Sequence, residues 1–159
     1  MQGNTGFKCH YLDGSLQLTN GYQGVQGFRV LWFQGVKVLG FQAVIMSECQ
    51  YVRVSGFQGV RVSGRQGVRV KEGKSVRVSK CQSDRVSGCE GVRVSGFQDV
   101  RVSECQGVRV KGYQSVRVSG CQIFRVTESH GVRMSGFHAA RQSNCQGVRL
   151  SGFKDVRMS

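Results

Sequence analysis

Fourteen arginines recur at intervals of eight residues, and they are the side chains whose type and spacing most clearly suggest a chemistry. A guanidinium group stays charged at physiological pH, and its fork of donors matches the oxygens of phosphates and carboxylates. The pattern therefore predicts a repeated anion-binding surface. The candidate residues are Arg53, Arg61, Arg69, Arg77, Arg85, Arg93, Arg101, Arg109, Arg117, Arg125, Arg133, Arg141, Arg149 and Arg157.

The chain as a whole is basic, with 23 Lys and Arg against 9 Asp and Glu, a formal net charge of +14. Such an imbalance favours association with polyanions such as nucleic acid or acidic polysaccharide. Duplex phosphates recur every ~3.4 Å per strand, which does not match the ~4.8 Å between stacked strands. We therefore expect any binding to lack sequence preference. The competing interpretation is that the arginines mark a solvated face and protect it against aggregation.

Six of the seven cysteines share one position of the repeat with the aromatic residues. Aromatics interleaved with basic residues are typical of platforms that stack single-stranded bases, but corner packing against a core is the simpler role. Cys89, Cys105 and Cys121 follow one another at every second repeat, so stacked coils would bring their Cα atoms into disulfide range. With no Cys-x-x-Cys motif, we expect free thiols that act as small hydrophobic groups, and no metal or cofactor site.

No constellation typical of an enzyme is present, so we expect neither an enzyme nor a small-molecule substrate. Of the three histidines, His130 and His138 lie in successive repeats, and we expect neither to have an acidic partner that would orient it as a base. The chain also lacks a Gly-x-Ser-x-Gly elbow and a Gly-x-x-x-x-Gly-Lys phosphate loop.

The elements that must position these residues follow from one octapeptide, or octad, Phe-Gln-Gly-Val-Arg-Val-Ser-Gly, repeated from residue 33 onward without insertion or deletion. Val-Arg-Val-Ser alternates apolar and polar residues, which is typical of a half-buried strand. Ser-Gly-Phe-Gln-Gly places glycines on both sides of a short bend. Units this short cannot fold alone and must stack on copies of themselves.

Two β architectures compete for this repeat. In an antiparallel meander, turns of even length would place the Val face of one strand beside the Arg face of the next, so each unit needs an odd loop. In a two-sided β-solenoid whose 16-residue coil holds two octads, identical positions stack automatically and both Val residues stay inside. We therefore predict an all-β octapeptide-repeat β-solenoid, with a meander or a largely disordered chain as alternatives.

The domain organisation predicted is an irregular N-terminal segment or cap over residues 1–32, followed by the tandem octapeptide repeat over residues 33–159. Asp84 replaces an inward Val, where a carboxylate without a partner is costly. The unit 137–144 has lost both core Val residues, so we expect the stack to loosen there.

The length of the octad resembles that of the repeats of bacterial ice-nucleation proteins. This resemblance implies coils made of two octads. This chain carries Val-Arg-Val where those repeats carry Thr-x-Thr. The resemblance therefore implies the coil length, and no activity is carried over.

Three functional hypotheses remain. The first is a structural scaffold that self-associates through the open edge of its sheet. The second is non-sequence-specific polyanion binding through stacked arginines. The third is a translated tandem repeat without a selected function, because many replacements, such as Val to Asp at Asp84, need only a single-base change. Without a secretory signal or a run of 18 apolar residues, a cytoplasmic or nuclear location is the default expectation.

Overall fold

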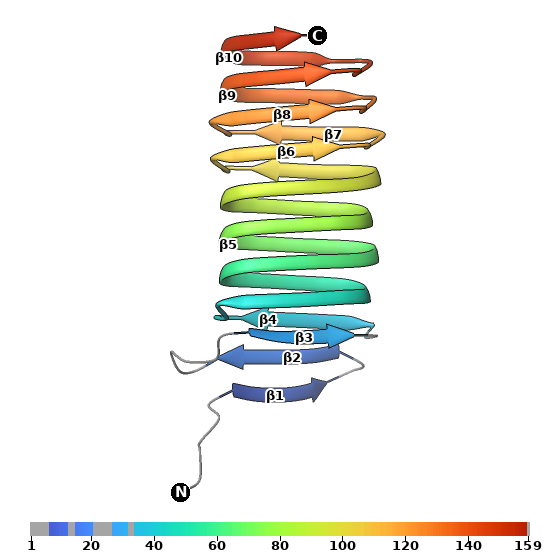
Figure 1. Ribbon diagram of the computed structural model, residues 1–159, viewed down its shortest axis with the longest axis vertical. Helices are drawn as coiled ribbons and strands as arrows, with labels where there is room; N and C mark the ends of the chain where they lie inside the picture. Colours follow the sequence, from blue (N-terminus) through green and yellow to red (C-terminus); the bar gives the residue numbers. More distant parts are fainter. Residues whose placement is uncertain (1–6, 13–14, 21–26, 32–33, 159) are drawn as a thin grey trace, which may run out of the picture.

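The computed structural model describes residues 7–12, 15–20, 27–31 and 34–158, and every element among them is a β-strand. Figure 1 shows the strands wound into a stack of coils, with a hairpin at the N-terminal end and β10 at the other end. The elements are β1 (Phe7–Leu12), β2 (Ser15–Asn20), β3 (Gly27–Leu31), β4 (Gly35–Leu39), β5 (Ala43–Ser103), β6 (Gly107–Lys111), β7 (Ser115–Ser119), β8 (Ile123–Thr127), β9 (Val132–Ser143) and β10 (Arg149–Met158).

Each strand from β3 onward pairs in parallel with a segment one coil away, and the paired residues are 16 apart in sequence. Arg109, for example, faces Arg93 on one side and Arg125 on the other. The predicted β-solenoid with 16-residue coils is therefore confirmed, and neither the meander nor the disordered chain is adopted. The reason is that an in-register stack keeps every Val on the same side of the sheet.

Each coil has two flat faces, on which the chain runs in opposite directions (Figure 1). The β6 face carries β3, β6 and β8, together with the segments of β5, β9 and β10 in register with them. The β7 face carries β4, β7 and the segments in register with those strands. Because β5 contains strands of both faces, it winds through several coils as one continuous element.

The core lies between the two faces and consists mainly of the two Val residues of each octad. Val92 and Val94 are buried on either side of Arg93, and Val116 and Val118 are buried on either side of Arg117. Full burial of a Val side chain contributes about 1.5–3 kcal/mol, and the contribution recurs in every unit. The alternation of Val with Arg therefore fixes which way each arginine points.

The corners depend on the eighth residue of the octad, which adopts a left-handed backbone conformation in most units. This conformation turns the chain, and the next residue then points into the core, as the buried Phe41, Cys49 and Phe137 do. Glycine adopts a positive φ without strain, but other residues do so at a cost. The eighth octad residues with a positive φ are Gly40, Glu48, Gly56, Glu72, Lys80, Gly88, Glu104, Gly112, Gly120, Glu128, Gly136, Asn144 and Gly152.

Regular strands also occur within residues 1–32, the segment predicted to form an irregular N-terminal cap. β1 and β2 form an antiparallel hairpin, and β2 pairs in parallel with β4 at a spacing of 20 residues, as in the Leu16–Val36 pair. β3 already follows the 16-residue register. The alternation in Ser-Leu-Gln-Leu-Thr-Asn, together with the preceding Asp-Gly pair, is the signal that could have indicated this hairpin. The domain boundary at residue 32 stays a prediction.

The unit 137–144 keeps the register of the stack, although its core Val residues are absent. Ala140 and Gln142 are buried in their place, and Arg141 faces Arg125 as the repeat requires. The buried ring of Phe124 stands opposite Ala140 in the neighbouring coil. We infer that a large residue beside a small one preserves the core volume here, so the expected loosening does not appear as a break in pairing.

Candidate functional site

The register places the fourteen predicted arginines in two columns, one on each face, and all fourteen side chains are exposed. On the β6 face the column runs from Arg61 to Arg157 in steps of two octads, and on the β7 face it runs from Arg53 to Arg149. Stacked strands lie ~4.8 Å apart, so each guanidinium in the interior of a column has like-charged neighbours on the coils above and below. The structure thus brings the residues of each column together on one surface.

Two further basic residues continue these columns toward the N-terminus. Lys37 faces Arg53 on the β7 face. Arg29 lies on the β6 face, separated from the arginine column by Ile45, which is its partner in the next coil. The sequence signal for Arg29 was the segment Gly27-Phe28-Arg29-Val30, which echoes the repeat before the strict register begins.

A groove runs beside the arginine column of the β6 face and crosses several coils. It encloses about 660 Å³ and is lined on one side by arginines from Arg61 to Arg125. The other side is lined by the seventh octad residues, which include Ser63, Ser79 and Ser95. Because residues five and seven of the octad point to the same side of a strand, the two columns form parallel walls. The groove therefore offers guanidinium and hydroxyl donors along one line.

The β7 face has a corresponding groove of about 550 Å³. It runs from Arg101 to Arg149 and is lined by the matching serines from Ser103 to Ser151. A smaller continuation of about 340 Å³ extends past Arg85 to Arg69. Both faces thus carry the same arrangement, which follows from the sequence repeat.

The column arginines have no acidic partner within ion-pairing distance in the described part of the chain. The ion pair found there joins Lys111 to Glu128 at 3.2 Å, and both side chains are more than half exposed. Neighbouring guanidinium groups at ~4.8 Å repel by roughly 0.9 kcal/mol in water before salt screening. An anion bound between them would relieve this repulsion.

The aromatic residues of the octad point away from these grooves. Phe41, Phe57, Tyr113 and Phe137 are buried, whereas Phe153 in the last coil is half exposed and stacks on Phe137 with ring centroids 5.8 Å apart. The four buried rings therefore pack the corners and are not exposed for base stacking. Phe33 and the side chain of Phe97 lie outside what the structure describes.

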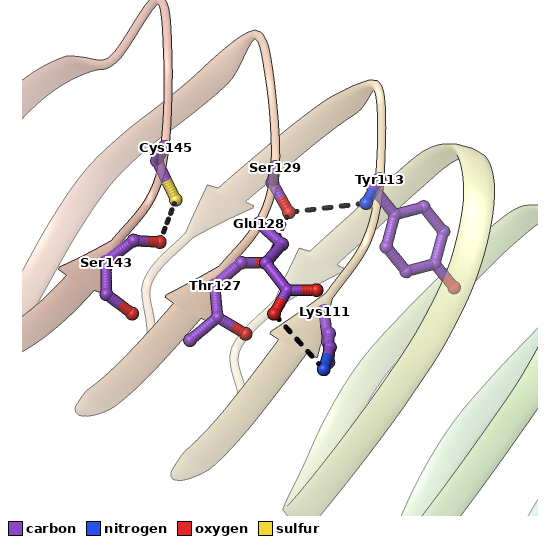
Figure 2. A network of polar contacts seen from close by, with 7 residues as sticks. All are labelled: Lys111, Tyr113, Thr127, Glu128, Ser129, Ser143 and Cys145. Atoms are coloured by element: carbon purple, nitrogen blue, oxygen red, sulfur yellow. Dashed lines mark hydrogen bonds and ion pairs between the residues drawn. The ribbon is translucent and has the colours of Figure 1, made fainter.

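The six cysteines of the repeat also point inward. Cys145 is partly buried and the other five are buried. Each thiol donates a weak hydrogen bond to the carbonyl oxygen two residues earlier, as from Cys105 to Ser103 at 3.2 Å. Ser129 stands at the same octad position and makes the same bond to Thr127 at 3.1 Å, and its Oγ also accepts a hydrogen bond from the backbone N–H of Tyr113 (Figure 2).

Asp84, Cys81 and Tyr113 form a buried polar cluster, which the sequence did not predict as a unit. Asp84 is buried as expected, and its Oδ2 accepts a hydrogen bond from the Tyr113 hydroxyl. Burial raises the pKa of Asp84 to about 6, although the hydrogen bond from Tyr113 opposes this shift. Burial and the charge of Asp84 raise the pKa of Cys81 to about 12. The cluster is enclosed in the core, so it offers no exposed reactive group.

The described residues contain neither a metal-binding cluster nor a membrane-spanning helix. No group of three or more His, Cys, Asp or Glu residues converges there on a point where a metal ion could sit. No helix in that part of the chain is long and apolar enough to cross a membrane.

The fold and the surface together define a class of protein, a β-solenoid with two cationic faces. No family model, curated protein or solved structure matches this chain.

Proposed function

We propose that this protein binds anionic polymers in the arginine-lined grooves of its two faces. The observation that carries this proposal is the groove of the β6 face, where five arginines from Arg61 to Arg125 line one continuous depression. Four steps of ~4.8 Å separate the first and last of these coils, so the groove is about 19 Å long. An extended anionic chain can follow it, whereas a small anion would contact only one or two guanidinium groups.

The chemistry of the walls fits a polyanion of broad class. Guanidinium groups bind phosphate, sulfate or carboxylate oxygens through paired donors, and serine hydroxyls add neutral hydrogen bonds. Backbone charges are the common element of nucleic acids and acidic polysaccharides, so the grooves would hold either one without reading its sequence. The net charge of +14 adds long-range attraction to the same ligands.

The test is the salt dependence of binding, measured by fluorescence anisotropy with a labelled single-stranded polynucleotide and a sulfated polysaccharide. With five arginines engaged, the affinity for the polynucleotide should fall roughly 100-fold between about 50 and 200 mM salt. Polynucleotides of different sequence should bind equally well. A salt-insensitive or sequence-selective interaction would contradict the proposal.

A matched pair of variants separates the groove from net charge. Arg93→Gln with Arg109→Gln removes two charges from the centre of the β6 groove. Lys74→Gln with Lys154→Gln removes two charges from exposed corner positions that do not line the grooves described above. The arginine pair should weaken binding and reduce the salt slope by about 1.5, whereas the lysine pair should have a smaller effect. Equal losses from both pairs would show that only net charge matters.

A second candidate is end-to-end self-association, which the exposure of β10 favours. Phe153 is 51% exposed and Met158 is 69% exposed, and β10 pairs with β9 along one edge only in the described chain. An unpaired edge is a template for a further strand. Salt should strengthen this association, because it screens the repulsion between chains of charge +14.

Sedimentation velocity distinguishes the two candidates, because salt has opposite effects on them. Assembly that grows with protein concentration in the absence of any polyanion favours the scaffold. Assembly that appears only after a polyanion is added, and that dissolves as salt is raised, favours polyanion binding. A monomer under both conditions would reject self-association.

A further inference from the structure

Three cysteines on successive coils form a thiol column inside one corner of the solenoid. Cys89, Cys105 and Cys121 are 3%, 2% and 1% exposed, respectively. The 16-residue register that pairs Gly91 with Gly107 and Gly107 with Ile123 also places these cysteines one above another. Backbone hydrogen bonds at the corner itself hold the coils together, from the N–H of Gln106 to the carbonyl of Cys89 and from that of Gln122 to the carbonyl of Cys105, both at 3.1 Å.

The three sulfurs also share one orientation. Each thiol lies against the carbonyl oxygen two residues earlier, at 3.3 Å for Cys89, 3.2 Å for Cys105 and 3.5 Å for Cys121. Because backbone and side-chain geometry repeat from coil to coil, the sulfurs follow the ~4.8 Å spacing of the strands. Interaction with Cys105 and burial raise the pKa of the Cys89 and Cys121 thiols.

This spacing matches the separation of two sulfurs that hold one metal ion between them. A zinc–thiolate bond is about 2.3 Å long, so two sulfurs on opposite sides of an ion of similar bond length lie about 4.6 Å apart. Thiolates select soft ions such as copper(I), and copper(I) and silver(I) readily accept two ligands in a line. We propose that the thiol column binds soft monovalent cations of this kind in the gaps on either side of Cys105, each ion held between two sulfurs.

The charge balance agrees with this chemistry. When one ion enters a gap, two thiols and M⁺ give a neutral M(SR)(HSR) unit, and one proton is released to solvent. The two sulfur–metal bonds form as one S–H bond breaks, with no change of oxidation state. A neutral unit suits a core in which an unpaired charge is costly. Zinc, by contrast, requires four ligands in a structural site, and the described residues supply no cluster of even three.

The chain itself supplies a tolerated substitution for the test. Ser129 is buried at the same octad position and makes the same bond to the carbonyl two residues earlier (Figure 2). Cys→Ser at a corner is therefore expected to preserve the fold. Cys49 provides the matched control, because it is equally buried and has the same thiol contact, to Ser47 at 3.5 Å. The residues two octads before and after it are Phe33 and Arg65, so the sequence places no cysteine one coil above or below it.

The experiment uses the reduced full-length protein and silver(I), which is added slowly as dilute silver nitrate in chloride-free buffer because the sulfurs are buried. Native mass spectrometry counts the ions retained, proton release is measured in weak buffer, and thermal unfolding reports stabilisation by an ion that binds the native state.

The unsubstituted protein and Cys49→Ser should retain silver, release one proton per ion and show a raised Tm. Cys89→Ser and Cys121→Ser should each retain one fewer ion, and Cys105→Ser should lose retention and the Tm shift. Retention by Cys105→Ser equal to that of the unsubstituted protein, or equal losses in Cys49→Ser and Cys105→Ser, would overturn the proposal.

Discussion

The hydroxyl of Tyr113 donates a hydrogen bond to Oδ2 of Asp84, although 29 residues separate them in the chain. Tyr113 stands at a corner, and its ring lies against Gly96, where a Cβ would be only 2.5 Å from the phenol oxygen. The other carboxylate oxygen of Asp84, Oδ1, is buried without a hydrogen-bond partner. The Val core of the solenoid therefore contains one ionisable group that is only half satisfied.

Asp84 should make the stability of the protein decrease as the pH rises. Its native pKa is about 6, compared with 3.8 for an unperturbed carboxyl group, so the native state binds the proton more tightly than the unfolded state. The contribution to stability is fully present below pH about 4 and is lost as the pH passes through about 6. The loss is about 3 kcal/mol, from about 1.4 kcal/mol per pKa unit. Urea unfolding from pH 3.5 to 7 measures it.

Two variants check that assignment. Asp84→Val combined with Tyr113→Phe removes the carboxyl group and the hydroxyl it would otherwise leave unpaired, so this variant should be more stable than the natural sequence at pH 7. Its stability should no longer fall between pH 4 and 6. Tyr113→Phe alone removes a hydrogen bond that favours the carboxylate, so it should destabilise the protein more at pH 7 than at pH 3.5. An unchanged pH profile in the double variant would show that Asp84 is not responsible.

Glu72→Gly should stabilise the solenoid. Glu72 has a φ of 53°, and a residue with a Cβ pays roughly 1–2 kcal/mol in this left-handed conformation. The greater freedom of glycine in the unfolded chain offsets part of this gain, so we expect a net gain of about 0.5–1 kcal/mol, measured as the free energy of unfolding in urea. Glu90→Gly is the control, because Glu90 has no positive φ. Equal effects of the two substitutions would contradict the explanation.

Gly73→Ala should destabilise the protein because the ring of Phe57 occupies the space where a side chain at residue 73 would lie. Overpacking of this kind costs about 1–3 kcal/mol. In a Phe57→Cys background the ring is absent, so the same substitution should cost much less, which a double-mutant cycle of unfolding free energies measures. Gly91→Ala serves as the control, since its added Cβ would meet the carbonyl of Lys74 at an ordinary 3.5 Å. Additive effects of Gly73→Ala and Phe57→Cys would refute this account of the corner.

Alkylation of the native protein should modify Cys145 before the other five cysteines of the repeat. Cys145 is partly buried, whereas Cys49, Cys81, Cys89, Cys105 and Cys121 are buried. A thiol inside the core reacts only when the coil opens, and reaction also requires the thiolate. Time-resolved labelling with iodoacetamide, followed by peptide mapping, measures the order. Modification of Cys105 at the same rate as Cys145 would contradict the packed corner.

The strict repeat made the architecture predictable. Without insertions or deletions, one register brings Arg93, Arg109 and Arg125 together and also aligns the cysteines of the thiol column. The alternation of Val with Arg predicted which side chains point outward, and the structure exposes every predicted arginine. The grooves were not predicted, because they also require the small serine side chains to line up beside the arginines.

By itself, the sequence determined the period, the inward valines and the outward charges, because an eight-residue unit that alternates every second residue keeps each octad position on the same side of the sheet in every in-register coil. The tertiary structure alone decided which distant groups meet, such as Tyr113 with Asp84 and the ring of Phe57 with the space at Gly73. It also decided that β2 joins β4 at a spacing of 20 residues, outside the repeat. The physical reason is that such contacts depend on the shape and direction of individual side chains and turns, which periodicity does not encode.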